Sequence, residues 1–159
     1  MCIRLETMTR ERMHEFYRSF EYDTAISPGK CTYVYDPEKV DQLYMKHMQQ
    51  GKIHFAIILE DFVIGDIYLK HIDRISHSCE LGIHTTNDVY KGKGYGTQAI
   101  QLILEYAFTK LKMNTVNANT FIDNNRSKRA LIKAGFTEIA QWDGFCHFEC
   151  RKSDYKCLD

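Results

Sequence analysis

The apolar residues of this chain change their spacing at one point, and that change restricts the possible folds more than any other feature. Upstream lie three short runs whose apolar residues are continuous or alternate as in strands: Ile53 to Leu59, Val63 to Lys70 and His77 to His84. Downstream, Gly96 to Leu111 carries its apolar residues at helical spacing. This order predicts a strand meander followed by a long helix, joined by the glycine-containing stretch Tyr90 to Thr97.

The segments on either side of this unit also read as strands and helices. We expect strands at Cys2 to Glu6, Val116 to Phe121, Phe136 to Gln141 and Phe145 to Arg151, and helices at Thr9 to Phe20, Asp36 to Met48 and Asn124 to Lys133. Asp36 followed by Pro37 is typical of a helix start, because aspartate caps the first free amides and proline fits the first helical position. Gly135 suits a helix end. No repeat or linker divides the sequence, so residues 1–159 predict a single domain.

Charge and hydropathy exclude several classes of protein. The chain has 21 basic and 21 acidic residues, so no overall positive field attracts nucleic acid or a membrane surface. No apolar run is long enough to span a bilayer, and Met1 to Arg10 lacks the apolar core of a signal peptide. We therefore expect a cytoplasmic protein that holds any anionic ligand through local donors.

The six cysteines, at positions 2, 31, 79, 146, 150 and 157, include no Cys-x-x-Cys pair. Cys146, His147 and Cys150 lie close in sequence, but no second pair with zinc spacing accompanies them. Strand alternation also puts Cys146 and His147 on opposite faces. We expect reduced thiols without a bound metal, which fits a reducing compartment.

The stretch Tyr90-Lys-Gly-Lys-Gly-Tyr-Gly-Thr97 has the features of an anion site. Its glycines allow a ligand to approach the main chain closely, and the first turn of the following helix presents free N–H groups and a partial positive charge. These features favour a diphosphate, with Lys91 and Lys93 adding full charges. The spacing fits neither a P-loop nor a Rossmann fingerprint. Taken alone, the stretch is equally compatible with a flexible hinge that opens the helix.

Four further segments accompany this loop in a fixed order: Glu80-Leu-Gly-Ile-His84, Tyr106-Ala-Phe108, Asn124-Asn-Arg-Ser127 and Lys133-Ala-Gly-Phe136. Together they resemble the GNAT superfamily of acyl-CoA N-acyltransferases, and most of all its ribosomal-protein alanine and spermidine acetyltransferases. The resemblance is continuous from Glu80 to Phe136. It implies an α/β (α+β) fold in which a central mixed, mostly antiparallel, twisted sheet of about six to seven strands is flanked by about four helices.

The resemblance implies acetyl-CoA as the acyl donor and a primary amine as the acceptor, either a small polyamine-like molecule or a protein N-terminus. The family's loop pattern is Arg/Gln-x-x-Gly-x-Gly/Ala, in which Gly94 and Gly96 match and Lys91 replaces the first residue. The amide near Ile83 would polarise the thioester carbonyl. The implied cofactor-binding residues lie in the loop and in the strands and helix beside it: Ile83, His84, Thr85, Lys91, Gly92, Lys93, Gly94, Tyr95, Gly96, Thr97, Asn119, Asn124 and Ser127.

An amine must lose a proton before it attacks a thioester, so the site needs a base. Glu80 is the first candidate, because it matches a recurrent glutamate of this branch and a carboxylate in a central strand needs a function or a buried partner. His84 is the second, since it shares a strand face with Glu80, and Gly82 leaves space between them. A structural ion pair for Glu80 and a solvated strand end for His84 remain open. Many family members have a tyrosine that protonates the leaving thiolate where this chain has Leu131.

No motif specifies the acceptor. Aromatic residues and carboxylates near the segment Glu21 to Tyr35 suit a cationic amine, and a satellite cluster of packed rings explains them equally well: Tyr17, Phe20, Tyr22, Tyr33, Tyr35, Glu15, Glu21 and Asp23. The expected partners are acyl-CoA and an amine, with no nucleic acid and no membrane, and a homodimer is compatible with the resemblance. The missing tyrosine leaves a second function open, a non-catalytic acyl-CoA-binding module on the same fold.

Overall fold

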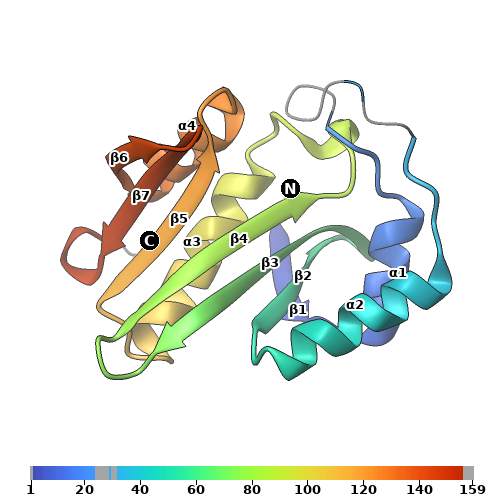
Figure 1. The fold of residues 1–159 in the computed structure, drawn as a ribbon, viewed down its shortest axis with the longest axis horizontal. Coiled ribbons are helices and arrows are strands. Elements are labelled where there is room, and N and C mark those ends of the chain that lie inside the picture. The colour runs from blue at the N-terminus through green and yellow to red at the C-terminus, as the bar shows by residue number, and fades with distance from the viewer. Residues whose placement is uncertain (1, 24–28, 30–31, 156–159) are drawn as a thin grey trace.

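The computed structural model describes residues 2–23, 29 and 32–155 of the chain, which are built around one sheet of seven strands (Figure 1). The strands lie in the order β1-β2-β3-β4-β5-β7-β6. Neighbouring strands are antiparallel except β4 and β5, which are parallel. With the four α-helices that the described residues form, this arrangement confirms the predicted α/β fold and its mixed, mostly antiparallel sheet.

The N-terminal half supplies β1 (Ile3–Thr7), α1 (Arg10–Arg18), α2 (Pro37–Gln49), β2 (Ile53–Leu59), β3 (Phe62–Asp73) and β4 (Ser78–Thr85). The C-terminal half supplies α3 (Tyr95–Thr109), β5 (Thr115–Phe121), α4 (Asn125–Ala134), β6 (Thr137–Trp142) and β7 (Phe145–Arg151). Short 3₁₀ turns, η1 (Asp88–Tyr90) and η2 (Lys152–Asp154), precede α3 and follow β7. Every predicted strand and helix is present, with ends displaced by a few residues.

Local signals place the ends of α2 and α4 as predicted. Asp36 accepts hydrogen bonds from the amides of Glu38 and Lys39, and Pro37 opens α2. Gly135 ends α4 with a φ of 111°, in the left-handed region that favours glycine. These ends fix where each helix meets the sheet.

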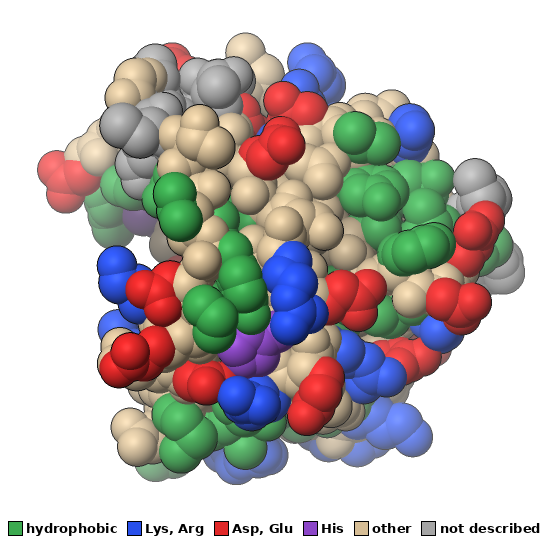
Figure 2. All heavy atoms as spheres, turned by 90° about the vertical axis from the view of Figure 1, so that its right-hand side faces the viewer, with side chains coloured by type: hydrophobic (Ala, Val, Ile, Leu, Met, Phe, Trp, Pro, Cys, Tyr) green, Lys and Arg blue, Asp and Glu red, His purple; other side chains and the backbone are tan. Residues whose placement is uncertain are grey.

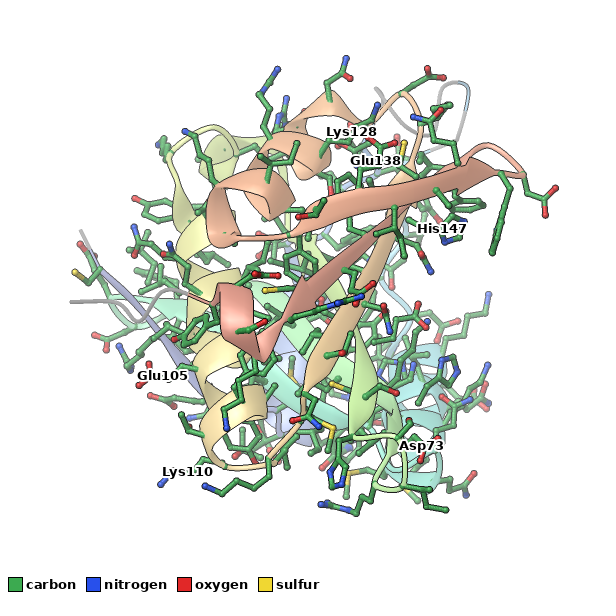
Figure 3. All side chains as sticks on the ribbon, turned by 90° about the vertical axis from the view of Figure 1, so that its left-hand side faces the viewer. Asp73, Glu105, Lys110, Lys128, Glu138 and His147 are labelled. Atoms are coloured by element: carbon green, nitrogen blue, oxygen red, sulfur yellow. The ribbon has the colours of Figure 1, made fainter. Side chains whose placement is uncertain are left out.

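The helices cover the two faces of the sheet unequally. α3 and α4 lie on one face, and α1 and α2 lie on the other beside β1, β2 and β3 (Figures 1 and 3). The α3 face holds the larger core, which includes buried Leu81, Ile103 and Phe108. The α1–α2 face holds a smaller core around Met13 and Phe16. The helices of the described residues leave the part of this second face formed by β4, β5 and β7 uncovered. Its side chains are mostly polar, and the stacked rings of Phe121 and Phe145 lie at one end of it. We call this part the open face.

Candidate active site

The strands β4 and β5 pair over only part of their length. Their parallel register ends with Leu81 opposite Ala118, although β4 continues to Thr85 and β5 to Phe121. Figure 1 shows the two strands diverging beyond this point, with the first turns of α3 between their open ends. The backbone groups of β4 beyond Leu81 that face β5 therefore lack a partner strand and are available to a ligand.

The loop between β4 and α3 forms an open cradle of backbone amides. Gly94 caps α3 with a φ of 86°, and Gly92 has a φ of 74°, which residues with a side chain rarely adopt. Gly96, in the first turn, lies outside this left-handed region, and a Cβ at any of the three glycines would have no atom within 4 Å. Lys93 is exposed beside them, and Thr97 is half-buried in the first turn. Neither backbone conformation nor packing requires glycine at position 96, and the open space at the helix start fits a diphosphate.

Lys91 already has two carboxylate partners. Its ammonium nitrogen lies 2.6 Å from Asp23 Oδ2 and 2.7 Å from Asp88 Oδ1, and its side chain is largely buried. The amide of Glu21 also donates to the carbonyl oxygen of Thr86 at 2.8 Å, so the segment after α1 is held against the loop that leads to α3. Contact between Lys91 and a phosphate would therefore require this lysine to exchange partners.

The other predicted cofactor-binding residues surround the divergence of the two strands. Ile83 and Thr85 are half-buried in the unpaired stretch of β4. Tyr95 is buried in the core, so that its backbone rather than its ring faces the cradle. Asn124 caps α4, because its side-chain oxygen accepts a hydrogen bond from the amide of Ser127 at 3.1 Å. The Asn-x-x-Ser element thus has a structural role at the start of a helix.

Position 131 belongs to the core. Leu131 is 2% exposed and lies among the apolar residues between the sheet and the helices on the α3 face. An aliphatic side chain therefore fills the place of the tyrosine that the resemblance implies. A hydroxyl donor near the diverging strands must come from another element.

Glu80 lies at the last paired positions of β4 and β5, on the open face. Its carboxylate accepts hydrogen bonds from Asn119 Nδ2 at 3.2 Å and from His71 Nδ1 at 2.9 Å. Lys70 Nζ is 3.6 Å away, and the Glu80 side chain remains 22% exposed. These contacts supply the partners that a carboxylate in a central strand needs, and they leave it accessible to a substrate.

His84 lies on the same face, closer to the open end of β4. Its Nδ1 is 3.1 Å from Oδ1 of buried Asp66, whose Oδ2 is 2.7 Å from Nε2 of His54. Burial opposes the charged form of Asp66, but the hydrogen bonds from the two imidazoles outweigh burial and hold the pKa of this carboxyl well below its usual range. The His84 side chain is 56% exposed. Partial loss of its hydration opposes the charged form, but the hydrogen bond and charge of Asp66 outweigh this loss, so the pKa of His84 is raised. Because Asp66 accepts from Nδ1, a neutral His84 presents Nε2 as an acceptor.

A third histidine connects this cluster to α2. Nδ1 of His47 lies 3.3 Å from Nδ1 of His54. Burial, together with the charges of Lys52 and His54, lowers the pKa of His47 to about 4, so its ring is neutral at pH 7. The rings of His47 and His54 thus form a chain of contacts that ends on Asp66. The hydrogen bonds of all three imidazole rings therefore depend on Asp66.

The prediction that Gly82 leaves free space between Glu80 and His84 is wrong. Tyr68, the residue paired with Gly82 across β3 and β4, places its ring in that space. A Cβ at position 82 would lie 2.3 Å from Cζ and 2.5 Å from Oη of Tyr68. The ring of a neighbouring strand therefore requires this glycine.

The aromatic residues after α1 pack on one another. The Phe20 ring centroid lies 5.7, 5.6 and 5.0 Å from those of Tyr17, Tyr22 and Tyr33. Burial raises the pKa of Tyr17 and of Tyr33, and Glu15 accepts a hydrogen bond from an amide of β3 at 3.0 Å. These contacts favour the satellite cluster. Figure 2 shows acidic and basic side chains interspersed on this side of the molecule.

The described thiols are free. Cys2 is exposed, whereas Cys79, Cys146 and Cys150 are buried, and positions 31 and 157 lie outside the described residues. Burial raises the pKa of both Cys79 and Cys150 to about 11, so these thiols stay protonated. Cys146 faces the core and His147 the opposite side of the sheet from α3, as alternation predicted (Figure 3).

Within the described part of the chain, no group of three or more His, Cys, Asp or Glu residues could hold a metal ion. No described helix is both long and apolar enough to cross a bilayer.

Two surface depressions lie towards the end of the sheet away from the glycine loop. One is lined by Gly51, Ile53 and residues 71–75, and the other by residues 114–115, 149 and 151–153. The label of Asp73 marks this end in Figure 3. The first depression touches the site only through His71, which donates to Glu80.

Sequence reasoning missed Asp66 and Tyr68. Asp66 interrupts the apolar run from Val63 to Leu69, and a charged residue between apolar neighbours in a strand is rarely buried without a partner. Gly82 in the middle of β4 was a second signal, since glycine inside a strand often marks a close approach by another group.

Comparison with known proteins agrees with this architecture. A model of the acetyltransferase (GNAT) domain matches residues 3–137. The chain is similar to the acetyltransferase PseH of Campylobacter jejuni, with 30% identity over 129 residues, which cover 81% of this chain and 79% of that protein. It is also similar to the spermidine N(1)-acetyltransferase of Vibrio cholerae, with 26% identity over 104 residues, which cover 64% of this chain and 59% of that protein.

A solved structure has the same fold. The spermidine N-acetyltransferase of Vibrio cholerae in complex with CoA and spermine matches with a TM-score of 0.78 at 19% identity, over 96% of this chain and 97% of that one. At this identity the match concerns the arrangement of strands and helices alone.

Proposed function

The chain belongs to the GNAT family of acetyltransferases and is an acetyl-CoA-dependent N-acetyltransferase, and from this premise we propose that its acceptor is a small cationic primary amine bound on the open face. The observation that carries the proposal is the divergence of β4 and β5 beyond Leu81 and Ala118, beside the glycine cradle. The divergence supplies a free strand edge, and the cradle supplies free amides. Glu80 lies on the open face where the strands part.

Backbone amides and the free edge of β4 match the diphosphate, the pantetheine arm and the thioester of acetyl-CoA. The thioester supplies the acetyl group when the cofactor is bound. The amides of residues 92–97 would hold the diphosphate, supported by three glycine positions with open space above them. The free edge of β4 from Gly82 to Thr85 would hold the pantetheine arm. The amide near Ile83 would then polarise the thioester carbonyl.

Charges and rings on the open face support a cationic acceptor. The strand registers align Glu80 of β4, Asn117 of β5 and Glu149 of β7 in one row. Trp142 on β6 is exposed and packs against His147, with ring centroids 4.3 Å apart. Glu149 is paired with Arg151 at 2.7 Å, and Lys70 lies 3.6 Å from Glu80, so an ammonium group would share these carboxylates with side chains of the protein. The exposed indole adds a surface for cation–π contact. The relative from Vibrio cholerae is named for spermidine, a molecule of this class.

We propose Glu80 as the base or amine anchor and His84 as the alternative base. Glu80 lies beside the parting strands, whereas Asp66 leaves Nε2 of His84 as an acceptor. The two residues are separated by four positions on one strand, about 13 Å along β4. One amine nitrogen therefore contacts only one of them directly.

Turnover of acetyl-CoA with a panel of amines tests the proposed function. Release of the CoA thiol should be saturable with diamines and polyamines and should exceed the rate without acceptor. Turnover with peptides alone would instead assign the acceptor to protein N-termini. Binding of CoA in calorimetry without turnover of any amine would favour the non-catalytic module.

We also propose a cytoplasmic location, which the free buried thiols Cys79, Cys146 and Cys150 support. A homodimer stays a prediction, and light scattering coupled to gel filtration would test it by measuring the mass in solution. A single domain over residues 1–159 also stays a prediction, and limited proteolysis would test it by showing where the folded chain is cut.

A further inference from the structure

Tyr68 brings a hydroxyl group to the point where β4 and β5 diverge. It pairs with Gly82, which is the first residue of β4 beyond the register shared with β5. The ring extends from β3 over β4, because a Cβ at Gly82 would lie 2.5 Å from Tyr68 Oη. The absence of a side chain at position 82 is what lets this hydroxyl lie over Gly82, where β4 no longer pairs with β5.

The Tyr68 hydroxyl is an unused hydrogen-bond donor. Within residues 2–23, 29 and 32–155 it has no hydrogen-bond partner, and it is open to solvent. Burial of the ring, together with the negative charges of Asp66 and Glu80, raises the pKa of Tyr68 to about 12. The group therefore stays protonated at neutral pH and can donate to a ligand.

Side chains from three other elements hold the ring in place. Lys52 Nζ, just before β2, lies 4.8 Å from the ring centre. The rings of His47, His54 and His84 lie with centroids 6.0, 5.6 and 6.0 Å from that of Tyr68. The hydrogen bonds that connect these histidines through Asp66 restrict their movement, so the position of the hydroxyl is restricted as well.

We propose that the Tyr68 hydroxyl donates a hydrogen bond to the CoA sulfur as it leaves. Tyr68 would thereby take the role of the helix tyrosine of the family, whose position is occupied by Leu131 in this chain. This inference rests on the proposed location of acetyl-CoA between β4 and β5. The amine nitrogen bonds to the carbonyl carbon, the carbon–sulfur bond breaks and its electron pair moves to sulfur. Tyr68 keeps its proton and stabilises the developing charge. The base takes the proton that the amine loses, and the released thiolate takes a proton from water.

Tyr68→Phe tests this role, because it removes the hydroxyl and retains the ring. We expect turnover at saturating substrates to fall by roughly 10- to 100-fold, the range for a hydrogen bond to a charged group, with little change in the KM for the amine. Tyr106→Phe is the matched control, since Tyr106 packs against Phe55 on the other side of the sheet. Equal turnover of Tyr68→Phe and wild type would overturn the inference while leaving the acetyltransferase function in place.

Binding provides a readout that does not depend on catalysis. Calorimetry with CoA and with desulfo-CoA measures what the sulfur contributes to affinity. The preference for CoA over desulfo-CoA should decrease in Tyr68→Phe by roughly 2- to 10-fold, the range for one neutral hydrogen bond. An unchanged preference would show that the hydroxyl does not contact the sulfur. Failure of the wild type to bind CoA would refute the proposed function itself.

Replacement of Tyr68 by 3,5-difluorotyrosine separates a donor from a packing role. Fluorine makes the phenol more acidic, so turnover should decline at high pH where that of wild type does not. The charged and titratable groups near the ring come from several elements: Asp66 and Lys70 on β3, Glu80 and His84 on β4, His54 on β2, Lys52 before β2, His47 on α2 and Tyr17 on α1. They are the same in both proteins, so the new limb would belong to position 68. Superimposable pH profiles would overturn the inference.

Discussion

Replacement of Gly96 by alanine should affect folding and cofactor binding in opposite directions. Gly96 lies in the first turn of α3 outside the left-handed region, and a Cβ there would meet no atom within 4 Å. Alanine loses less backbone entropy than glycine when it enters a helix. Gly96→Ala should therefore raise the free energy of unfolding by roughly 0.5–1 kcal/mol.

The same methyl group would occupy the space through which a diphosphate approaches the first-turn amides. Hydrogen bonds to a charged group contribute about 1.5–3 kcal/mol each. Loss or lengthening of one such bond should raise the Kd for CoA by roughly 10- to 100-fold. The structure thus predicts a more stable protein that binds CoA less well.

Urea unfolding and calorimetry with CoA measure the two effects. Thr109→Ala is the matched control, because Thr109 is exposed at the far end of the same helix and its replacement also favours helix formation. The control should be more stable with an unchanged Kd. A Gly96→Ala protein with the Kd of wild type would place the diphosphate elsewhere, and a less stable one would contradict the open space around this residue.

Glu80→Gln keeps the size of the side chain and should lower turnover at least ~100-fold with unchanged CoA affinity and without the acidic limb of the pH–rate profile. A near-normal profile would transfer the role of base to His84. Asp23→Asn removes one carboxylate from Lys91 and should increase CoA affinity in calorimetry by roughly 2- to 5-fold; a decrease would show that the pair instead prepares the loop for the ligand. His47 has its pKa lowered from 6.5 to about 4 in the fold, so the unfolded chain takes up this proton first as the pH falls. In urea unfolding, the free energy of unfolding of the wild type should fall by on the order of 1–2 kcal/mol between pH 7 and 4 because of this group, after allowance for its contact with solvent. The free energy of unfolding of His47→Gln should not show this decrease. Parallel pH dependences of the two proteins would refute a neutral His47.

The order of strands and helices could be predicted from the sequence, because it depends on interactions between near neighbours in the chain. The change of apolar spacing around residue 90 separated the meander from α3. Asp36 and Pro37 marked the start of α2, and Gly135 marked the end of α4, since caps and turns involve residues a few positions apart. The motifs from Glu80 to Phe136 then identified the family, whose domain model matches residues 3–137.

The tertiary structure alone decided what surrounds each candidate site residue. Lys91 meets Asp23 across 68 positions of sequence, and no local pattern predicts such a pair. Tyr68 covers Gly82 only because the register of β3 and β4 places the two residues opposite each other. A shift of that register by one residue would turn Tyr68 to the other face of the sheet. Sequence alone therefore determined the family and the residues available for chemistry, whereas strand register and packing determined which of those residues meet.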